Sequence, residues 1–199
     1  MGKPDRRTER TRSALMGSFV SAILSEGYDA VTVERVAELA NVGRSTFYMH
    51  YKSKEDILRQ SMARPSSVLA VLVGNELPMG VLVKQLAHFH DQRRRNHIFF
   101  EGRVRRIWIQ CLAERIEPRL AKLARLAGAQ PVLPLPLAAL QIAETQLALI
   151  GNWLDVRPGA KIDAIAEALV ASTDAIAESL LRCRGPLRIP GERHELREG

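Results

Sequence analysis

The chain has 199 residues, of which 46% are hydrophobic, 26% charged and 5% aromatic. This length suits one large domain or one small and one medium domain, and the apolar share is too high for a disordered chain. The formal charge of +7 indicates an anionic partner, such as nucleic acid, a membrane surface or an acidic ligand, without choosing among them.

The distribution of apolar residues and cysteines excludes several classes of protein. No run of about 18 apolar residues is present, so no membrane span is expected, and the charged N-terminus lacks the apolar segment of a secretory signal. Cys111 and Cys183 do not form a CxxC pair, which argues against a disulfide framework or a cysteine zinc site. We expect a cytoplasmic protein with no membrane association, no cofactor and no bound metal.

The N-terminal part predicts a long helix followed by two short ones. Apolar residues along about 8–26 give the first helix one buried stripe, which consists of Leu15, Phe19, Ala22 and Ile23. Thr32 is a suitable N-cap for a short helix over about 33–40, and a tight turn separates it from a second over about 44–51. Helices of about eight residues are not stable alone in water. We therefore expect them to be braced by the first helix and by a fourth that Ser53 caps.

The rest of the chain also predicts helices, separated by proline-containing segments. The expected ranges are about 53–65, 78–95, 96–100, 103–126, 136–154 and 162–182. Pro118 interrupts the helix over 103–126, where we expect a bend or a break, and 128–136 forms a connector with three prolines. These features predict an all-α protein with an N-terminal three-helix helix-turn-helix domain and a helical C-terminal domain.

The two short helices have the arrangement of a helix-turn-helix, whose second helix lies in the DNA major groove. Arg44 at the start of that helix can bind guanine with two hydrogen bonds, and a serine or threonine hydroxyl can contact several bases. Tyr48 and His50 can donate to phosphates, and Lys54 adds a positive charge for the DNA backbone. The alternatives are a simply solvated Arg44, a half-buried Tyr48 and local packing of His50.

The stretch VTVERVAELANVGRSTFYMHYKSKEDIL resembles the DNA-binding domain of the TetR family of transcriptional regulators. The matching features are the Thr32 start, Val36-Ala37, Val42 in the turn, Thr46-Phe47-Tyr48, His50-Tyr51 and Lys54-Glu55. The resemblance covers about residues 8–60. It implies DNA contacts at Thr32, Arg44, Ser45, Thr46, Tyr48, His50 and Lys54. The chain departs from the family pattern at Asn41, where Gly is commonest, and at Gly43, where Ser usually caps the recognition helix.

The resemblance also implies that a ligand-binding and dimerisation domain follows the DNA-binding part. We therefore expect a helix-turn-helix DNA-binding domain over 1–52, a helical effector-binding and dimerisation domain over 53–184 and a disordered tail over 185–199.

The last two predicted helices indicate a dimer interface. The helix over 136–154 is apolar on two faces. Its stripe of Leu140, Ala143, Leu147, Ile150 and Leu154 can face the chain's own core and the other face a partner. The last helix carries a ridge of alanines that allows a second helix to approach closely. Two copies would form a four-helix bundle about a two-fold axis, with a fully buried monomeric core as the alternative. The predicted interface residues are Ala139, Ile142, Leu149, Trp153, Ala164, Ala168, Ala171 and Ala175.

The large aromatic residues outside the DNA-binding part indicate an effector cavity, with ordinary core packing as the alternative. The arginine clusters at 93–95 and 103–106 are either solvated helix faces or groups that neutralise an acidic effector. The candidate ligand-binding residues are Phe89, Arg105, Trp108, Gln146 and Trp153.

These observations predict a regulator rather than an enzyme, since no catalytic motif is present. The expected function is that of a homodimer that binds a palindromic operator in double-stranded DNA and is released by a small-molecule effector. The resemblance favours a repressor, since repression is more usual than activation in the TetR family. The alternatives are a constitutive or architectural DNA-binding protein without an effector, and a helical protein that binds only small molecules.

Overall fold

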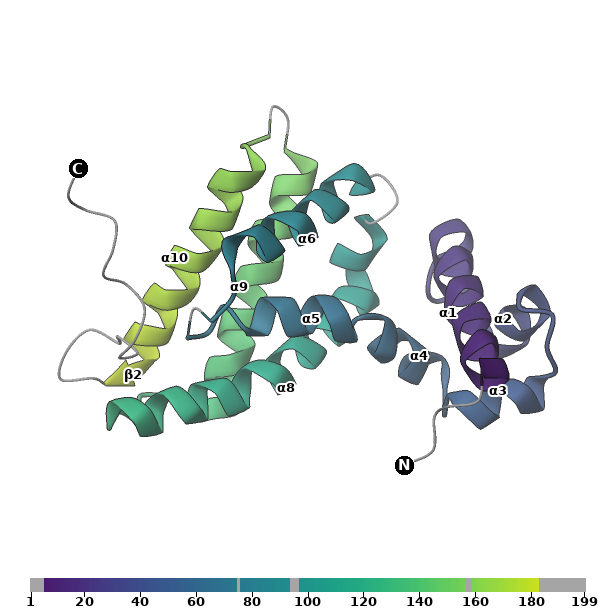
Figure 1. Cartoon of the computed structure of the whole chain (residues 1–199), viewed down its shortest axis with the longest axis horizontal. Coiled ribbons are helices and arrows are strands. Elements are labelled where there is room, and N and C mark those ends of the chain that lie inside the picture. Colours follow the sequence, from purple (N-terminus) through teal and green to yellow (C-terminus); the bar gives the residue numbers. More distant parts are fainter. Residues whose placement is uncertain (1–5, 75, 94–96, 157–158, 183–199) are drawn as a thin grey trace.

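The computed structural model describes residues 6–74, 76–93, 97–156 and 159–182, whose regular secondary structure is helical apart from one pair of two-residue strands. Helices α1 (Arg6–Glu26), α2 (Val33–Leu39) and α3 (Arg44–His50) form a compact N-terminal group, and α4 (Lys54–Ser61) leads from it to the larger group (Figure 1). The larger group contains α5 (Ala63–Ala70), α6 (Met79–Asp91), the 3-10 helix η1 (His97–Phe100), α8 (Gly102–Ala127), α9 (Leu135–Asp155) and α10 (Ile162–Leu180). The predicted all-α architecture is confirmed.

The N-terminal group has its own small core, built as the sequence pattern predicts. The stripe of α1 is completely buried at Leu15, Phe19, Ala22 and Ile23. Phe47 of α3 and Tyr51 directly after it are also buried, and the Tyr51 hydroxyl donates to the Arg12 carbonyl oxygen of α1 at 3.3 Å. Asn41 has a φ of 52°, in the left-handed region that asparagine tolerates better than most residues. This explains how the chain makes the turn before α3 without the usual glycine.

Two local signals define α4 and its junction with α5. The Ser53 hydroxyl accepts a hydrogen bond from the Asp56 backbone N–H at 3.1 Å, and the Asp56 carboxylate accepts one from the Lys52 backbone N–H at 2.8 Å, which confirms the predicted cap. The helix then breaks at Met62, before Pro65. Pro65 lies in the first turn of α5, where its missing N–H costs little because the first N–H groups of a helix have no partner within it.

Helix α8 continues through Pro118, so of the expected bend or break the break does not occur. Ile116 and Leu120 on either side of this proline are fully buried. This apolar packing holds the helix together although one backbone hydrogen bond is missing at the proline.

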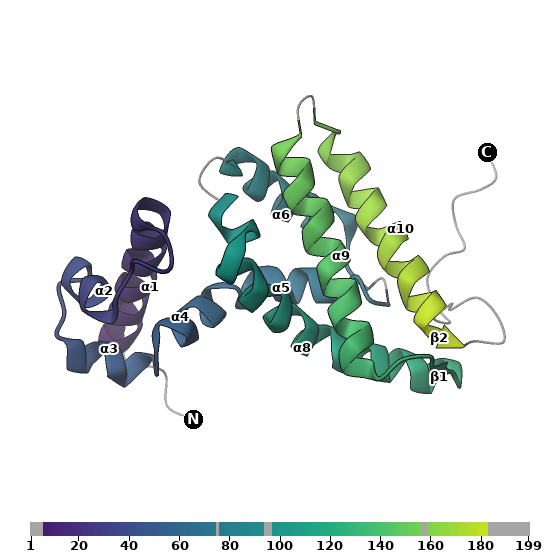
Figure 2. The same cartoon turned by 180° about the vertical axis from the view of Figure 1, so that it is seen from behind.

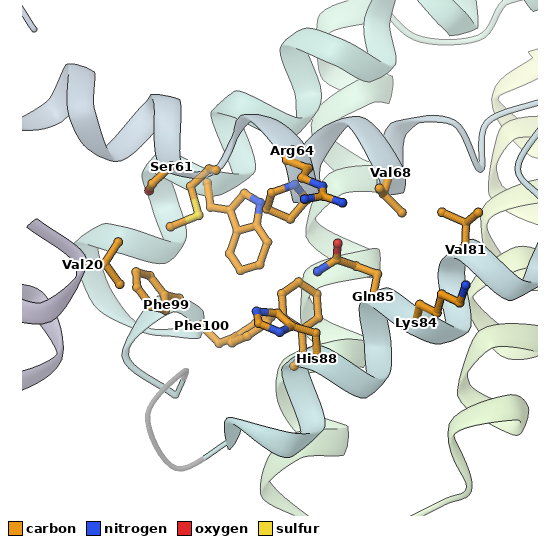
Figure 3. A pocket seen from close by; sticks show the side chains of 14 residues that line it. Val20, Ser61, Arg64, Val68, Val81, Lys84, Gln85, His88, Phe99 and Phe100 are labelled. Carbon is orange, nitrogen blue, oxygen red and sulfur yellow. The ribbon is translucent and has the colours of Figure 1, made fainter. Parts of the chain in front are cut away.

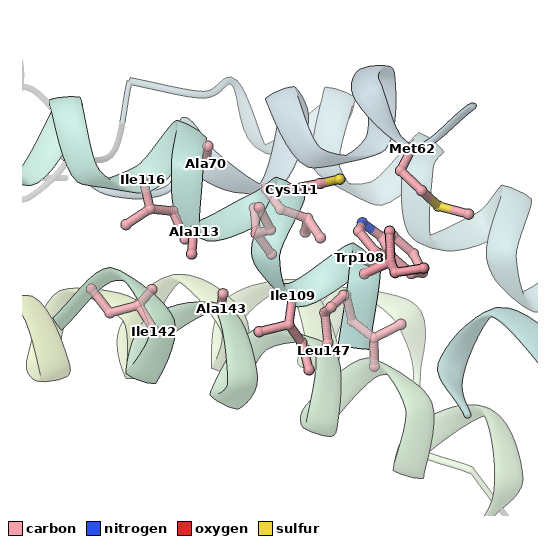
Figure 4. Packing of buried hydrophobic residues seen from close by; sticks show 14 of the residues in the cluster. Met62, Ala70, Trp108, Ile109, Cys111, Ala113, Ile116, Ile142, Ala143 and Leu147 are labelled. Atoms are coloured by element: carbon pink, nitrogen blue, oxygen red, sulfur yellow. The ribbon is translucent and has the colours of Figure 1, made fainter. Parts of the chain in front are cut away.

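Helix α8 is the central element of the larger group and packs against α5 and α9 (Figure 4). Trp108 of α8 is fully buried, and its indole N–H donates to the Ser66 hydroxyl of α5 at 3.1 Å. Helix α10 in turn packs against α9 and α6, and Figure 2 shows α9 and α10 side by side. No helix among the described residues is long and apolar enough to cross a membrane.

The two strands, β1 (Gln130–Pro131) and β2 (Leu181–Arg182), pair antiparallel and join the connector after α8 to the end of α10. They end α10 at Leu180, two residues before the predicted end. Two-residue strands have no periodicity, so the sequence pattern did not reveal them. The predicted tail over 185–199 and Cys183 lie outside the described residues.

Candidate DNA-binding surface and effector cavity

Helix α3 exposes one side while its buried side fixes its position. Phe47 is completely buried, whereas Tyr48 is 47% and Met49 82% exposed. The guanidinium of Arg44 lies 5.6 Å from the Tyr48 ring centroid and forms an ion pair with Glu34 of α2 at 2.8 Å. The first turn of α3 therefore presents a cation that is held at the surface next to α2.

The other predicted DNA contacts of α2 and α3 lie on or near this surface. Ser45 is exposed, and Thr46 and His50 are partly exposed. Thr32 is exposed at the start of α2, where its hydroxyl accepts a hydrogen bond from the Arg35 backbone N–H at 3.1 Å. This arrangement leaves the start of α2 and the outer side of α3 open to the same partner.

Lys54 occupies a different environment from the one expected of a free phosphate-binding cation. Its ammonium donates to the backbone carbonyl oxygens of Tyr28 at 2.8 Å and Asp29 at 3.4 Å, and lies 4.5 Å from the Tyr28 ring centroid. Desolvation by burial lowers the pKa of Lys54. In this structure Lys54 holds the loop between α1 and α2 against the start of α4.

Two residues of the exposed surface that α2 and α3 form were not identified from the sequence. Glu34 orients Arg44, and Met49 is the most exposed of the large apolar side chains in the described residues. An exposed methionine on a recognition helix can make apolar contact with a thymine methyl group. The signal for Met49 was its position between Phe47 and Tyr51, which both face inward.

The N-terminal group contacts the larger group through polar side chains as well as through α4. Arg59 of α4 forms an ion pair with Glu114 of α8. The guanidinium of Arg103, at the start of α8, lies 5.8 Å from the Tyr28 ring centroid. Helix α4 also contacts both α1 and α8. These interactions connect α8 of the larger group directly to α4 and to Tyr28, which follows α1 in the N-terminal group that contains α3.

A cavity of about 580 Å³ lies where the two groups meet, with walls from α1, the α4–α5 junction, α6, η1 and α8 (Figure 3). Its aromatic wall consists of Phe89, Phe99, Phe100 and Trp108. Its polar side chains are Ser61, Arg64, Lys84, Gln85 and His88. The volume is typical of sites for small organic ligands.

Phe89 and Trp108 line this cavity as predicted, but three other candidate residues do not. The Arg105 guanidinium pairs with Glu144 of α9 at 2.6 Å. The buried amide of Gln146 donates to the Leu69 carbonyl at 3.3 Å and to the Thr173 hydroxyl at 2.9 Å. The Arg105 guanidinium and the Gln146 amide nitrogen are therefore already used within the fold.

Trp153 is the third candidate that the structure places elsewhere. Its indole N–H donates to the Ala160 carbonyl at 2.8 Å, and its ring stacks on His90 with centroids 5.3 Å apart. The cavity lining instead includes Arg64, Lys84 and Gln85, which the sequence analysis did not select. Isolated polar residues on amphipathic helices give no sequence signal that separates them from solvated ones.

The predicted interface face of α9 is wrong in part. Ala139 and Ile142 are completely buried within the chain and Trp153 is 6% exposed, so they offer almost no surface to a partner, whereas Leu149 is partly buried. Leu140, assigned to the core, is 36% exposed. The cause is the central position of α9, because α8 and α10 pack against it and use both apolar stripes.

The predicted alanine ridge of α10, in contrast, faces outward. All four of its members are exposed, namely Ala164, Ala168, Ala171 and Ala175. Leu137 and Leu140 of the adjacent helix α9 are also exposed, at 51% and 36%. Small residues of α10 and two leucines of α9 are thus exposed in the single chain.

The similarity to known protein sequences lies in the N-terminal part of the chain. The profile of the family described as bacterial regulatory proteins, tetR family, matches residues 21–60. The HTH-type transcriptional regulator TcmR of Streptomyces glaucescens is 38% identical over 56 residues, which are 28% of this chain and 25% of that protein. The matched segments span 16% to 29% of the lengths of three such curated relatives.

Solved structures extend the likeness to most of the chain. A TetR transcriptional regulator from Streptococcus agalactiae 2603V has a TM-score of 0.56 at 23% identity, with 85% of this chain and 96% of that chain covered. NalD, the secondary repressor of the MexAB-OprM multidrug efflux pump in Pseudomonas aeruginosa, has a TM-score of 0.52 at 19% identity, with 89% and 99% covered. These similarities show that the chain shares the overall fold of the two proteins.

The family match agrees with the prediction of a regulatory protein rather than an enzyme. The sequence match lies on the helices that form the exposed α2–α3 surface, and the structural likeness covers the larger group as well. Residues 21–60, which carry the helix-turn-helix, match the TetR family of bacterial regulatory proteins, and the fold of the chain as a whole is similar to that of solved TetR regulators.

Proposed function

We propose that this chain is a DNA-binding transcriptional repressor, which binds a palindromic operator as a homodimer and is released by a small-molecule effector. The observation that carries the proposal is the outer side of α3, where Arg44, Ser45 and Tyr48 are exposed while buried Phe47 fixes the helix. A helix of this kind fits the major groove and reaches base edges with its N-terminal residues. We assign DNA binding to residues 1–52, and effector binding and dimerisation to 53–184.

The outward face of α9 and α10 supports a homodimer. Exposed alanines on α10 allow a symmetry-related helix to pack closely, and the exposed Leu137 and Leu140 of α9 add apolar surface. Two helices from each protomer would make a four-helix bundle about a two-fold axis. Such a dimer presents two recognition helices to two half-sites, so a palindromic operator follows from its symmetry.

The position of the cavity supports release by an effector. Val20 of α1 and Met62 at the break between α4 and α5 both line it, together with side chains of α6 and α8. A ligand that fills this space contacts the DNA-binding helices and the larger group at the same time. It can favour one of two relative positions of these groups and thereby change the spacing of the recognition helices in the dimer. The cavity also favours this function over a constitutive DNA-binding protein without an effector.

Substitution of Arg44 tests the DNA-reading role. We expect Arg44→Ala to weaken binding to a specific duplex by at least about 30-fold, because the dimer loses one arginine–guanine pair in each half-site and each pair contributes about 1–3 kcal/mol of discrimination. Fluorescence anisotropy with labelled DNA from upstream of the protein's own gene measures this effect. Arg125→Gln, which removes an exposed arginine at the far end of α8, is the control. Equal affinities of wild type and Arg44→Ala would contradict this role.

A further inference from the structure

The chemistry of the cavity wall identifies a class of ligand. Building on the proposed effector role, we infer that the cavity binds a planar aromatic carboxylate. Its ring packs against Phe89, Phe99 and Phe100, and its carboxylate faces Arg64 and Lys84. Three observations support this ligand class: the aromatic wall, the unpaired cations, and the lack of acidic side chains in the described lining.

The cations of the cavity have no counter-ion in the part of the chain that the structure describes. The described lining contains Arg64, Lys84 and His88 but no aspartate or glutamate. The side chains of Arg64 and Lys84 are exposed and take part in no hydrogen bond or ion pair within the described ranges. The wall therefore carries positive charge that an anionic ligand can neutralise.

Some arginines near the cavity are already neutralised by ion pairs within the fold. Arg59 pairs with Glu114, Arg105 with Glu144, and Arg119 with Glu76 at 3.1 Å. Arg64 and Lys84, which lie on the separate helices α5 and α6, are left without such partners at the cavity. In Figure 3, Arg64 and Gln85 reach toward the cavity from opposite walls, so the Gln85 amide can donate to the same anion.

The aromatic wall favours a flat ring over an aliphatic chain. Phe89 makes edge-to-face contacts with Phe100 at 5.7 Å and with Trp108 at 5.8 Å, and the Phe100 and Trp108 centroids are 4.9 Å apart. An added ring can continue this cluster with further edge-to-face or offset contacts. The Trp108 N–H is already bonded to Ser66. The accessible part of the wall, which is the partly exposed Phe99 and the edges of Phe89 and Phe100, therefore offers the ligand carbon surface rather than a hydrogen-bond donor.

Titration calorimetry on the whole chain without DNA tests this ligand class with four probes of similar size. We expect 2-naphthoate to bind, and the neutral 2-naphthamide, the aliphatic decanoate and the cationic 2-naphthylmethylamine each to bind at least about tenfold more weakly. Loss of one charge-assisted hydrogen bond accounts for about this factor in the neutral probe. No detectable binding of 2-naphthoate, or equal or tighter binding of any other probe, would overturn the assignment.

Variants locate the anion and separate charge recognition from folding. The double variant Arg64→Gln/Lys84→Gln should weaken 2-naphthoate binding at least about tenfold and leave 2-naphthamide binding unchanged, because only the anion uses both charges. Arg125→Gln removes an exposed arginine away from the cavity and should change neither affinity. Unchanged 2-naphthoate binding in the double variant, or equal losses for both probes, would refute the site. Because no DNA is present, failure here leaves the test of operator binding unaffected.

Discussion

Replacing Phe47 by alanine is expected to lower the free energy of unfolding by about 3–5 kcal/mol and to abolish specific DNA binding. The ring is completely buried and packs against Tyr51 with centroids 5.7 Å apart. Helix α3 has seven residues, and such a short helix depends on tertiary packing. Without this anchor, the exposed side of α3 loses its fixed orientation toward the DNA.

Urea denaturation and anisotropy with specific DNA measure the two effects of Phe47→Ala. Met49→Ala is a matched control for stability, since Met49 lies on the same helix but is 82% exposed. We expect the control to change the free energy of unfolding by no more than about 0.5 kcal/mol. A similar small change for Phe47→Ala would show that this ring does not anchor α3.

The second large effect is expected for Ala168→Glu on the outward ridge of α10. Ala168 is exposed in the single chain, so a glutamate can be accommodated there without disturbing the core. In the proposed dimer the same carboxylate is buried next to its symmetry mate, where two unpaired like charges cost several kcal/mol. The variant should be a folded monomer with operator affinity lowered by at least about 100-fold.

Sedimentation velocity and circular dichroism distinguish loss of association from loss of folding in Ala168→Glu. Gln110→Glu, which puts the same charge on an exposed position of α8, should remain dimeric. Dimeric Ala168→Glu protein with unchanged DNA affinity would place the interface elsewhere.

The sequence allowed a detailed prediction of the N-terminal helices because their signals are local. The stripe from Leu15 to Ile23, the Thr32 and Ser53 caps and the inward-facing Phe47 each depend on residues a few positions apart. Such spacing is set by helix geometry alone. The family resemblance rests on the same short stretch and was confirmed by the match to residues 21–60.

The larger group was less predictable because its contacts are long-range. Periodicity showed that α9 is apolar on two faces, but it could not show that α8 and α10 bury both Ala139 and Ile142. Pro118 lowers helix propensity, yet tertiary packing of α8 overrides it. The cations of the cavity, Arg64 and Lys84, come together from two helices and have no common sequence motif.

The central claim is that α3 reads DNA in a symmetric dimer, and selection from a pool of random duplexes tests it most directly. The whole chain should enrich an inverted repeat whose half-site centres lie about one helical turn, or a multiple of it, apart. The Arg44→Ala protein should lose preference at one or two equivalent positions in each half-site. Enrichment of no sequence, or of a site without two-fold symmetry, would contradict the account.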